Sequence, residues 1–214
     1  MEQVKNDLLL EPSAYKETLG LDLEQIVSAE NQFAYLSACG NIQEKLAFTD
    51  FDDTLYSRTP QLTEDRFAKN RGKAGNDLVE FKIGFTNFFE KYYNPELVVS
   101  ELAQKTDIIL TAGRERVQKG KMEYTGLDYL DDIIVKEHKY KPRAILDYCL
   151  KNKTCPKVIE FYDDKAFALT KHFQHLSKLM QNTIILKQVQ LSKDTLNQVE
   201  NIDEIIIQNG EPKS

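Results

Sequence analysis

Residues 46–56 of the chain read LAFTDFDDTLY, a short apolar run followed directly by acidic residues. Polar residues bound the run, which is typical of one strand of a buried parallel sheet. Asp50 and Asp52 then fall at the carboxyl end of that strand, where open α/β sheets bind their ligands. Three acidic side chains within four residues repel one another, so we expect a cation or a catalytic role to hold them there. An acidic loop that caps the next helix is the alternative interpretation.

Polar residues recur at comparable places further along the chain. One apolar segment ends at Thr111, and another ends at Asp163 and Asp164. Between them, Lys139 and Lys141 stand at the start of a predicted helix. Strand ends and helix starts of this kind converge in a doubly wound fold. The sequence therefore predicts an α/β fold with a doubly wound, Rossmann-like parallel sheet.

In type and order these residues resemble the four motifs of the haloacid-dehalogenase-like (HAD) phosphohydrolase superfamily. Those motifs are D-x-D-x-T, a strand-terminal Thr or Ser, a Lys, and a strand-terminal acidic pair. The resemblance covers about residues 45–190 and implies a phosphatase that hydrolyses a phosphomonoester through an aspartyl-phosphate. It implies that Asp50 is the nucleophile and Asp52 the general acid/base, with Thr111 in the second motif.

The same resemblance implies a Mg²⁺ cofactor. Its predicted ligands are Asp50, Asp52 through its backbone carbonyl, and the pair Asp163 and Asp164, of which either can be the direct ligand. The lysine of the third motif remains open. Lys141 fits best because Pro142 follows it at a plausible first helical position; Lys139 and Lys136 are the alternatives.

Arginines near these motifs are candidates to bind the phosphorylated substrate. They are Arg114, three residues after Thr111, together with Arg58 and Arg66 in the polar segment after the first motif. A small phosphorylated molecule is the expected partner. Residues 114–157 hold eleven Lys and Arg against seven Asp and Glu, which leaves a nucleotide or a nucleic-acid end as an alternative substrate. A non-catalytic HAD-like binding or signalling module is the other alternative.

Three parts of the chain are expected from its pattern. Residues 1–44 form a helical extension of unassigned role, with turn signals at Pro12 and Gly20. Residues 45–208 form the catalytic domain. Its segment at about 56–93 is longer than the single crossover helix that joins two parallel strands, and the extra residues are expected to form a small helical cap or flap. Residues 209–214 are expected to be a frayed tail.

Within these parts, hydrophobic periodicity predicts the individual elements. A helix over 22–38 is expected to bury Leu23, Ile26, Val27, Phe33 and Ala34. Further helices are predicted at 78–92, 95–104, 115–124, 142–152 and 164–179. Strands are predicted at 131–135, 157–162 and 183–187, followed by a short helix and a strand ending at Ile207.

Composition limits the class of protein. The 214 residues are 41% hydrophobic, which suffices for one sizeable core. A net charge of −6 argues against broad, non-specific nucleic-acid binding. Three cysteines without metal-ligand spacing favour a reducing compartment. We see neither a signal peptide nor a membrane span, and therefore expect a cytoplasmic protein with no membrane partner. The oligomeric state is not predicted.

Overall fold

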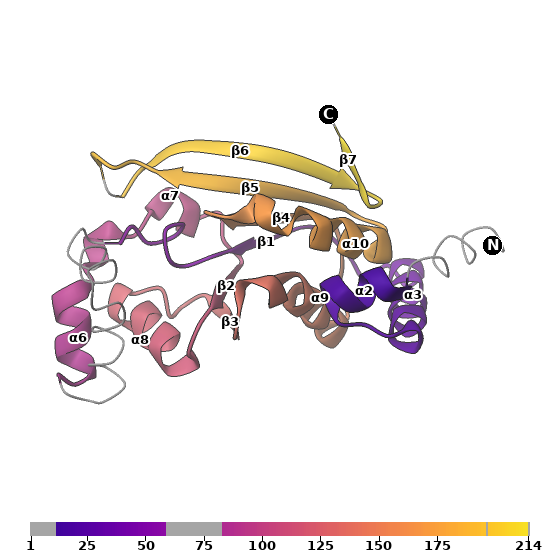
Figure 1. Ribbon diagram of the computed structural model, residues 1–214, viewed down its shortest axis with the longest axis horizontal. Coiled ribbons are helices and arrows are strands. Elements are labelled where there is room, and N and C mark those ends of the chain that lie inside the picture. Colours follow the sequence, from indigo (N-terminus) through magenta and orange to yellow (C-terminus); the bar gives the residue numbers. More distant parts are fainter. Residues whose placement is uncertain (1–11, 59–82, 196, 214) are drawn as a thin grey trace. The chain divides into compact units, whose positions relative to one another are not determined.

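The structure is a computed structural model that describes residues 12–58, 83–195 and 197–213. Its fold is α/β, as predicted, with seven strands in one mostly parallel sheet flanked by helices (Figure 1). The strand order is β3-β2-β1-β4-β5-β6-β7. The first strand, β1, stands between β2 and β4, so later strands of the chain are added on both sides of it. This is the pattern of a doubly wound fold.

The chain divides into two compact units, which are described one at a time. The first unit contains the described residues up to Ala47, together with 137–188 and the residues from Asp203 onward. The second unit contains 48–136 and the described residues of 189–202. The helices before β1 thus belong to a unit that also holds later elements of the chain.

Most helices and strands of the first unit were predicted from the sequence pattern. Its helices are α2 (Pro12–Leu19), α3 (Leu23–Ala38), α9 (Lys141–Asn152) and α10 (Thr170–Met180), with short 3₁₀ turns η2 (His138–Tyr140) and η3 (Ala166–Leu169). Its strands include most of β1 (Ile42–Thr49), β4 (Cys155–Asp163) and most of β5 (Thr183–Leu191). β4 and β5 pair in parallel, from Val158 opposite Thr183 to Asp163 opposite Gln188. The predicted helix at 164–179 is thus a 3₁₀ turn followed by α10.

The helix α2 is absent from the prediction, which placed only turn signals at its two ends. Pro12 begins the helix, where its missing N–H is no loss. Gly20, at φ 66°, ends it by donating its N–H to the carbonyl of Lys16. The helix packs on α10, where the Thr18 hydroxyl lies 2.8 Å from Nδ1 of His175.

The helix α3 was predicted, and Asp22 caps it by accepting the N–H of Gln25 in a capping box. Its buried face differs in part from the expected one. Ile26 and Phe33 are buried as predicted, with Ala29 and Leu36, whereas the predicted core residues Leu23, Val27 and Ala34 are exposed. In Figure 1, α3 lies beside α9, and the two helices are in contact.

The second unit contains the elements that follow the first motif. They are α6 (Phe85–Tyr92), η1 (Pro95–Leu97), α7 (Ser100–Ala103), β2 (Ile108–Ala112), α8 (Glu115–Thr125) and β3 (Asp131–Val135). The end of β1 pairs in parallel with β2, with Phe48 opposite Ile108, and β2 pairs in parallel with β3. Residues 59–82 lie outside the described part of the chain, and most of the predicted cap or flap falls there.

The C-terminal elements differ from the prediction. The described residues between β5 and β6 (Val199–Gln208) form bends and turns instead of a short helix. In Figure 1 the arrowheads of β5 and β6 stand at opposite ends, so the two strands are antiparallel. Residues 211–213, expected to fray, form β7 (Glu211–Lys213), which pairs antiparallel with β6.

No helix in the described ranges is both long and apolar enough to span a membrane.

Candidate functional site

The loop that follows β1 is a tight turn held by backbone hydrogen bonds. The N–H of Leu55 donates to the carbonyl of Asp50 (3.2 Å), and the N–H of Tyr56 donates to the carbonyl of Phe51 (2.9 Å). Phe51, Leu55 and Tyr56 are fully buried and anchor the turn. Asp53 adopts the left-handed conformation, at φ 62°, which Asp tolerates better than most residues. This turn fixes Asp50, 8% exposed, directly after the strand.

Asp52 forms an ion pair that the sequence analysis missed. Its Oδ2 lies 2.6 Å from Nζ of Lys121, which projects from α8. The Lys121 side chain is 3% exposed and the Asp52 side chain 18% exposed. The same Nζ lies 5.8 Å from the ring centre of Phe51 and 5.7 Å from that of Tyr93. The second unit therefore holds its candidate acid/base in a contact with a buried ammonium.

Thr111 is the second-last residue of β2 and is buried, so the strand-end position predicted for it is correct. The chain leaves the strand through Gly113, whose N–H donates to the carbonyl of Val135 (2.8 Å). Gly113 has φ 151°, a conformation that residues with a side chain rarely adopt, and a Cβ there would also lie 2.5 Å from Nε2 of Gln118, so the backbone conformation favours glycine. That Nε2 donates to the carbonyl of Ala112 (2.9 Å) and fixes the end of the strand.

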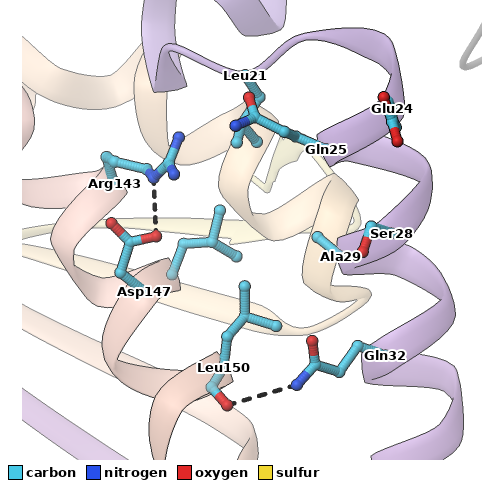
Figure 2. Close-up of a pocket in the computed structure, with 10 residues that line it drawn as sticks. Leu21, Glu24, Gln25, Ser28, Ala29, Gln32, Arg143, Asp147 and Leu150 are labelled. Carbon is cyan, nitrogen blue, oxygen red and sulfur yellow. Dashed lines mark hydrogen bonds and ion pairs between the residues drawn. The ribbon is translucent and has the colours of Figure 1, made fainter.

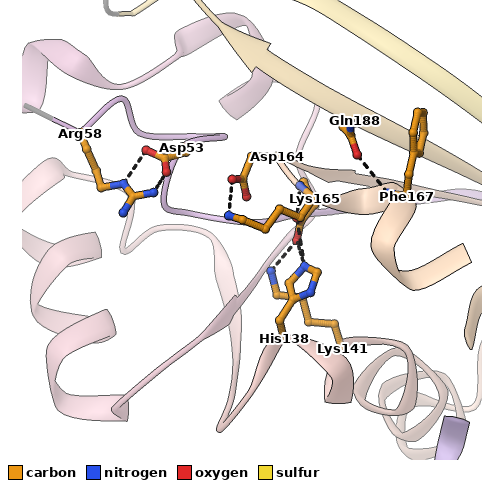
Figure 3. A network of polar contacts seen from close by, with 9 residues as sticks. Asp53, Arg58, His138, Lys141, Asp164, Lys165, Phe167 and Gln188 are labelled. Atoms are coloured by element: carbon orange, nitrogen blue, oxygen red, sulfur yellow. Dashed lines mark hydrogen bonds and ion pairs between the residues drawn. The ribbon is translucent and has the colours of Figure 1, made fainter. Parts of the chain in front are cut away.

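The three arginines predicted to bind substrate have different positions. Arg58 forms an ion pair with Asp53 in the turn after β1 (Figure 3). Arg114 is exposed at the N-cap of α8. Arg66 lies outside the described residues. Their part in substrate binding stays a prediction.

In the first unit, Asp163 ends β4 and is fully buried. Its Oδ2 accepts a hydrogen bond from Nζ of Lys141 at 2.6 Å. Nε2 of His138 lies 2.9 Å from the same oxygen, and the backbone N–H of Lys165 donates to Oδ1 at 2.7 Å. Lys141 and His138 are both drawn in Figure 3. One carboxylate thus gathers contacts from η2, from the start of α9 and from the loop after its own strand.

The charge of Asp163 follows from these contacts. Burial alone would raise the pKa of its carboxyl group, but the hydrogen bond with His138 and the charge of Lys141 outweigh burial and lower the pKa to about 2. Asp163 is therefore ionised at neutral pH. The Lys141 side chain is 1% exposed, so both members of this ion pair are removed from water.

Among the three candidates for the third-motif lysine, Lys141 is the one that is buried. It begins α9, so Pro142 is the second helical residue and not the first, where the sequence analysis placed it. Lys139 is 55% exposed and pairs with Glu137, and Lys136 is exposed. Contact with a predicted site carboxylate thus favours Lys141.

Asp164 follows Asp163 and is partly exposed, with a side chain 22% accessible. It forms an ion pair with Lys165 (Figure 3). The first unit therefore holds Lys141, Asp163 and Asp164, whereas the second holds Asp50, Asp52 and Thr111.

Three residues with contacts to predicted site carboxylates were missed, and one of them is Lys165, which directly follows the acidic pair. His138 stands three positions before Lys141, and its closeness to the third motif is a signal that could have found it. Lys121 is separated from Asp52 by 69 positions, and no local pattern links them. Its position on a charged helix is typical of a solvated side chain.

A separate groove of about 290 Å³ lies in the first unit between α3 and α9 (Figure 2). Arg143 and Asp147 form an ion pair on its α9 side, and Nε2 of Gln32 donates to the carbonyl of Leu150. None of the residues that line it is a predicted site residue.

No protein-family model, curated protein or solved structure matches the chain. The function is therefore argued from the chain's own residues.

Proposed function

We propose that the protein is a Mg²⁺-dependent phosphatase that hydrolyses a phosphomonoester through an aspartyl-phosphate on Asp50. The observation that carries the proposal is the buried ion pair of Lys141 and Asp163. It supports the HAD resemblance because a lysine and a strand-terminal acid of two predicted motifs make direct contact. Burying two charges is costly, and perturbed ionisable groups cluster at functional sites.

Mg²⁺ suits the donor set of the proposed site. The HAD resemblance assigns the cation to the side chains of Asp50, Asp163 and Asp164. All three offer carboxylate oxygens, which a hard divalent cation prefers over nitrogen or sulfur. The carbonyl of Asp52 is the fourth protein ligand that we propose. Bound there, the cation would neutralise charge on the phosphoryl oxygens.

Asp163 and Asp164 differ in how many carboxylate lone pairs they have available to bind the cation. A carboxylate offers about four lone-pair sites, and Asp163 already uses some for Lys141, His138 and the N–H of Lys165. Asp164 is the more exposed of the two. We therefore assign Asp164 the larger share of ligation and Asp163 the fixing of Lys141.

The first chemical step joins Asp50 to the substrate. A carboxylate oxygen of Asp50 attacks phosphorus and the bond from phosphorus to the leaving oxygen breaks. Asp52 acts in its acid form, protonated on the carboxyl oxygen that does not accept from Lys121, and gives that proton to the leaving oxygen. The alcohol product leaves. The Thr111 hydroxyl and the Lys141 ammonium supply hydrogen bonds to the phosphoryl oxygens as negative charge redistributes.

The second step releases the phosphoryl group. A water oxygen attacks phosphorus, Asp52 takes up a proton of that water, and the bond from phosphorus to Asp50 breaks. Asp50 returns to a carboxylate and inorganic phosphate leaves. One water molecule is consumed for each ester cleaved, so the cycle balances.

A substrate panel tests the proposal. The wild-type protein is assayed with p-nitrophenyl phosphate, phosphorylated metabolites and oligonucleotides phosphorylated at either end, with Mg²⁺ or with a chelator. We expect turnover only with the metal and none with Asp50→Asn. The matched control is Asp131→Asn, the same change at an exposed carboxylate of β3. Binding of panel members without turnover would favour the non-catalytic alternative.

A further inference from the structure

Lys121 is a buried cation that the reaction described above does not use. We propose that Lys121 is a positioning residue that holds the acid/base Asp52 in the orientation required for proton transfer; this inference rests on the proposed function. The argument uses contacts within the second unit alone.

The position of Lys121 on its helix is the first support. The buried residues of α8 are Gln118, Lys121, Met122 and Thr125, so Lys121 belongs to the face that packs inward. The hydroxyl of Thr125 donates to the carbonyl of Lys121 at 2.8 Å. A lysine on the inward face of a helix loses rotamer freedom and hydration, which favours a specific partner for its ammonium.

Aromatic rings surround that ammonium and are themselves fixed. The rings of Phe51 and Tyr93 both lie within cation–π range of Nζ. Phe51 stacks on Tyr56 with ring centres 5.5 Å apart. The ring centre of Tyr93 lies 5.1 Å from that of Tyr56. The Tyr56 hydroxyl accepts the N–H of Asn94, which locks the ring in place. These two rings therefore confine the ammonium on the side of Phe51 and Tyr93.

Asp52 is more exposed than Lys121. The Asp52 side chain keeps 18% of its surface accessible, so one end of the ion pair reaches water while the other is enclosed. An Asp side chain has two rotatable bonds, and a contact of 2.6 Å to a fixed Nζ restricts both. General acid catalysis needs its proton within hydrogen-bond reach of the leaving oxygen, so this restriction raises the rate of the proton-transfer steps.

Leaving-group dependence distinguishes positioning from a structural role. Turnover of p-nitrophenyl phosphate, whose leaving oxygen is weakly basic, is compared with turnover of glycerol phosphate, whose leaving oxygen is strongly basic. We expect Lys121→Met to lower kcat for glycerol phosphate by about 10²-fold and to lower kcat for p-nitrophenyl phosphate much less. KM should change little for either substrate. Lys121→Arg, which keeps the charge, should keep more of the kcat for glycerol phosphate than Lys121→Met does.

Two controls accompany these variants. Lys119→Met removes an exposed lysine from the same helix and should leave both rates unchanged. A cycle with Asp52→Asn tests the route of the effect: once Asp52 cannot carry a proton, Lys121→Met should add little further loss. Circular dichroism and thermal unfolding report folding for every variant. If Lys121→Met does not fold, Lys121→Gln is measured in its place, because it removes the charge but keeps a hydrogen-bond donor.

The outcomes separate this inference from the proposed function. A wild-type protein without activity on these two esters and on every other member of the substrate panel contradicts both. Wild-type activity with equal losses on the two esters, or with a full additional loss in the Asp52→Asn background, overturns the role of Lys121 and leaves the phosphatase proposal standing. A selective loss that disappears in that background supports the role.

Discussion

Replacing Lys141 by methionine should destabilise the first unit through the charge that it leaves behind. The two side chains of the Lys141–Asp163 pair are 1% and 0% exposed, and their contact atoms are 2.6 Å apart. Removing one partner of a buried ion pair typically costs about 3–5 kcal/mol. Because Asp163 retains His138 and the N–H of Lys165, we expect the lower end of that range, about 3 kcal/mol.

The assay is unfolding in urea and by heat. For a chain of this size a loss of about 3 kcal/mol lowers Tm by about 6–12 °C. Lys139→Met is the matched control, since that lysine is 55% exposed and its solvent-screened pair with Glu137 should contribute little to stability. The double variant Lys141→Met with Asp163→Asn should recover part of the loss, because no buried charge is then left unpaired. Equal effects of Lys141→Met and Lys139→Met would refute this reasoning.

Two further predictions concern ionisable groups of the first unit. Burial alone would raise the pKa of Glu160, but its hydrogen bonds with Lys45 and Lys187 outweigh burial and lower it; the stabilisation is thus complete above pH 4.5 and is lost as pH falls through the lowered pKa. Glu160→Gln should flatten that acid limb in a plot of Tm against pH, and an unchanged limb would show that this cluster does not contribute. Burial raises the pKa of the Cys149 thiol to about 12, whereas Cys39 is exposed; iodoacetamide at pH 8 should therefore label Cys39 in the native protein and Cys149 only after unfolding, as peptide mass spectrometry can determine. Early labelling of Cys149 would contradict the buried position.

Much of the fold could be predicted because its signals are local. An apolar run with an acidic end predicts β1 and the position of Asp50, and the same reasoning places Thr111 and Asp163 at strand ends. The helix α2 was missed because Pro12 and Gly20 are equally suited to turns and to the two ends of a helix. Its eight residues are too few for periodicity to decide between these.

The errors at other positions have a tertiary cause. Which face of α3 is buried depends on the elements that it meets, so Leu23 and Val27 could be apolar and still exposed. The strand β7 depends on pairing with β6, which short polar segments do not signal. The contact of Lys121 with Asp52 joins positions far apart in the chain, and a single sequence carries no sign of it.

The most direct test of the central claim is chemical trapping of the phosphorylated aspartate. The protein is mixed with its best substrate and Mg²⁺, quenched, and reduced with borohydride, which converts an aspartyl-phosphate to homoserine. Trypsin should then release residues 46–58, a peptide that contains Asp50, Asp52 and Asp53. We predict homoserine at Asp50 alone, and none without substrate. Continued turnover with no homoserine in this peptide, or with homoserine at Asp52 or Asp53, would contradict the proposal that Asp50 is the nucleophile.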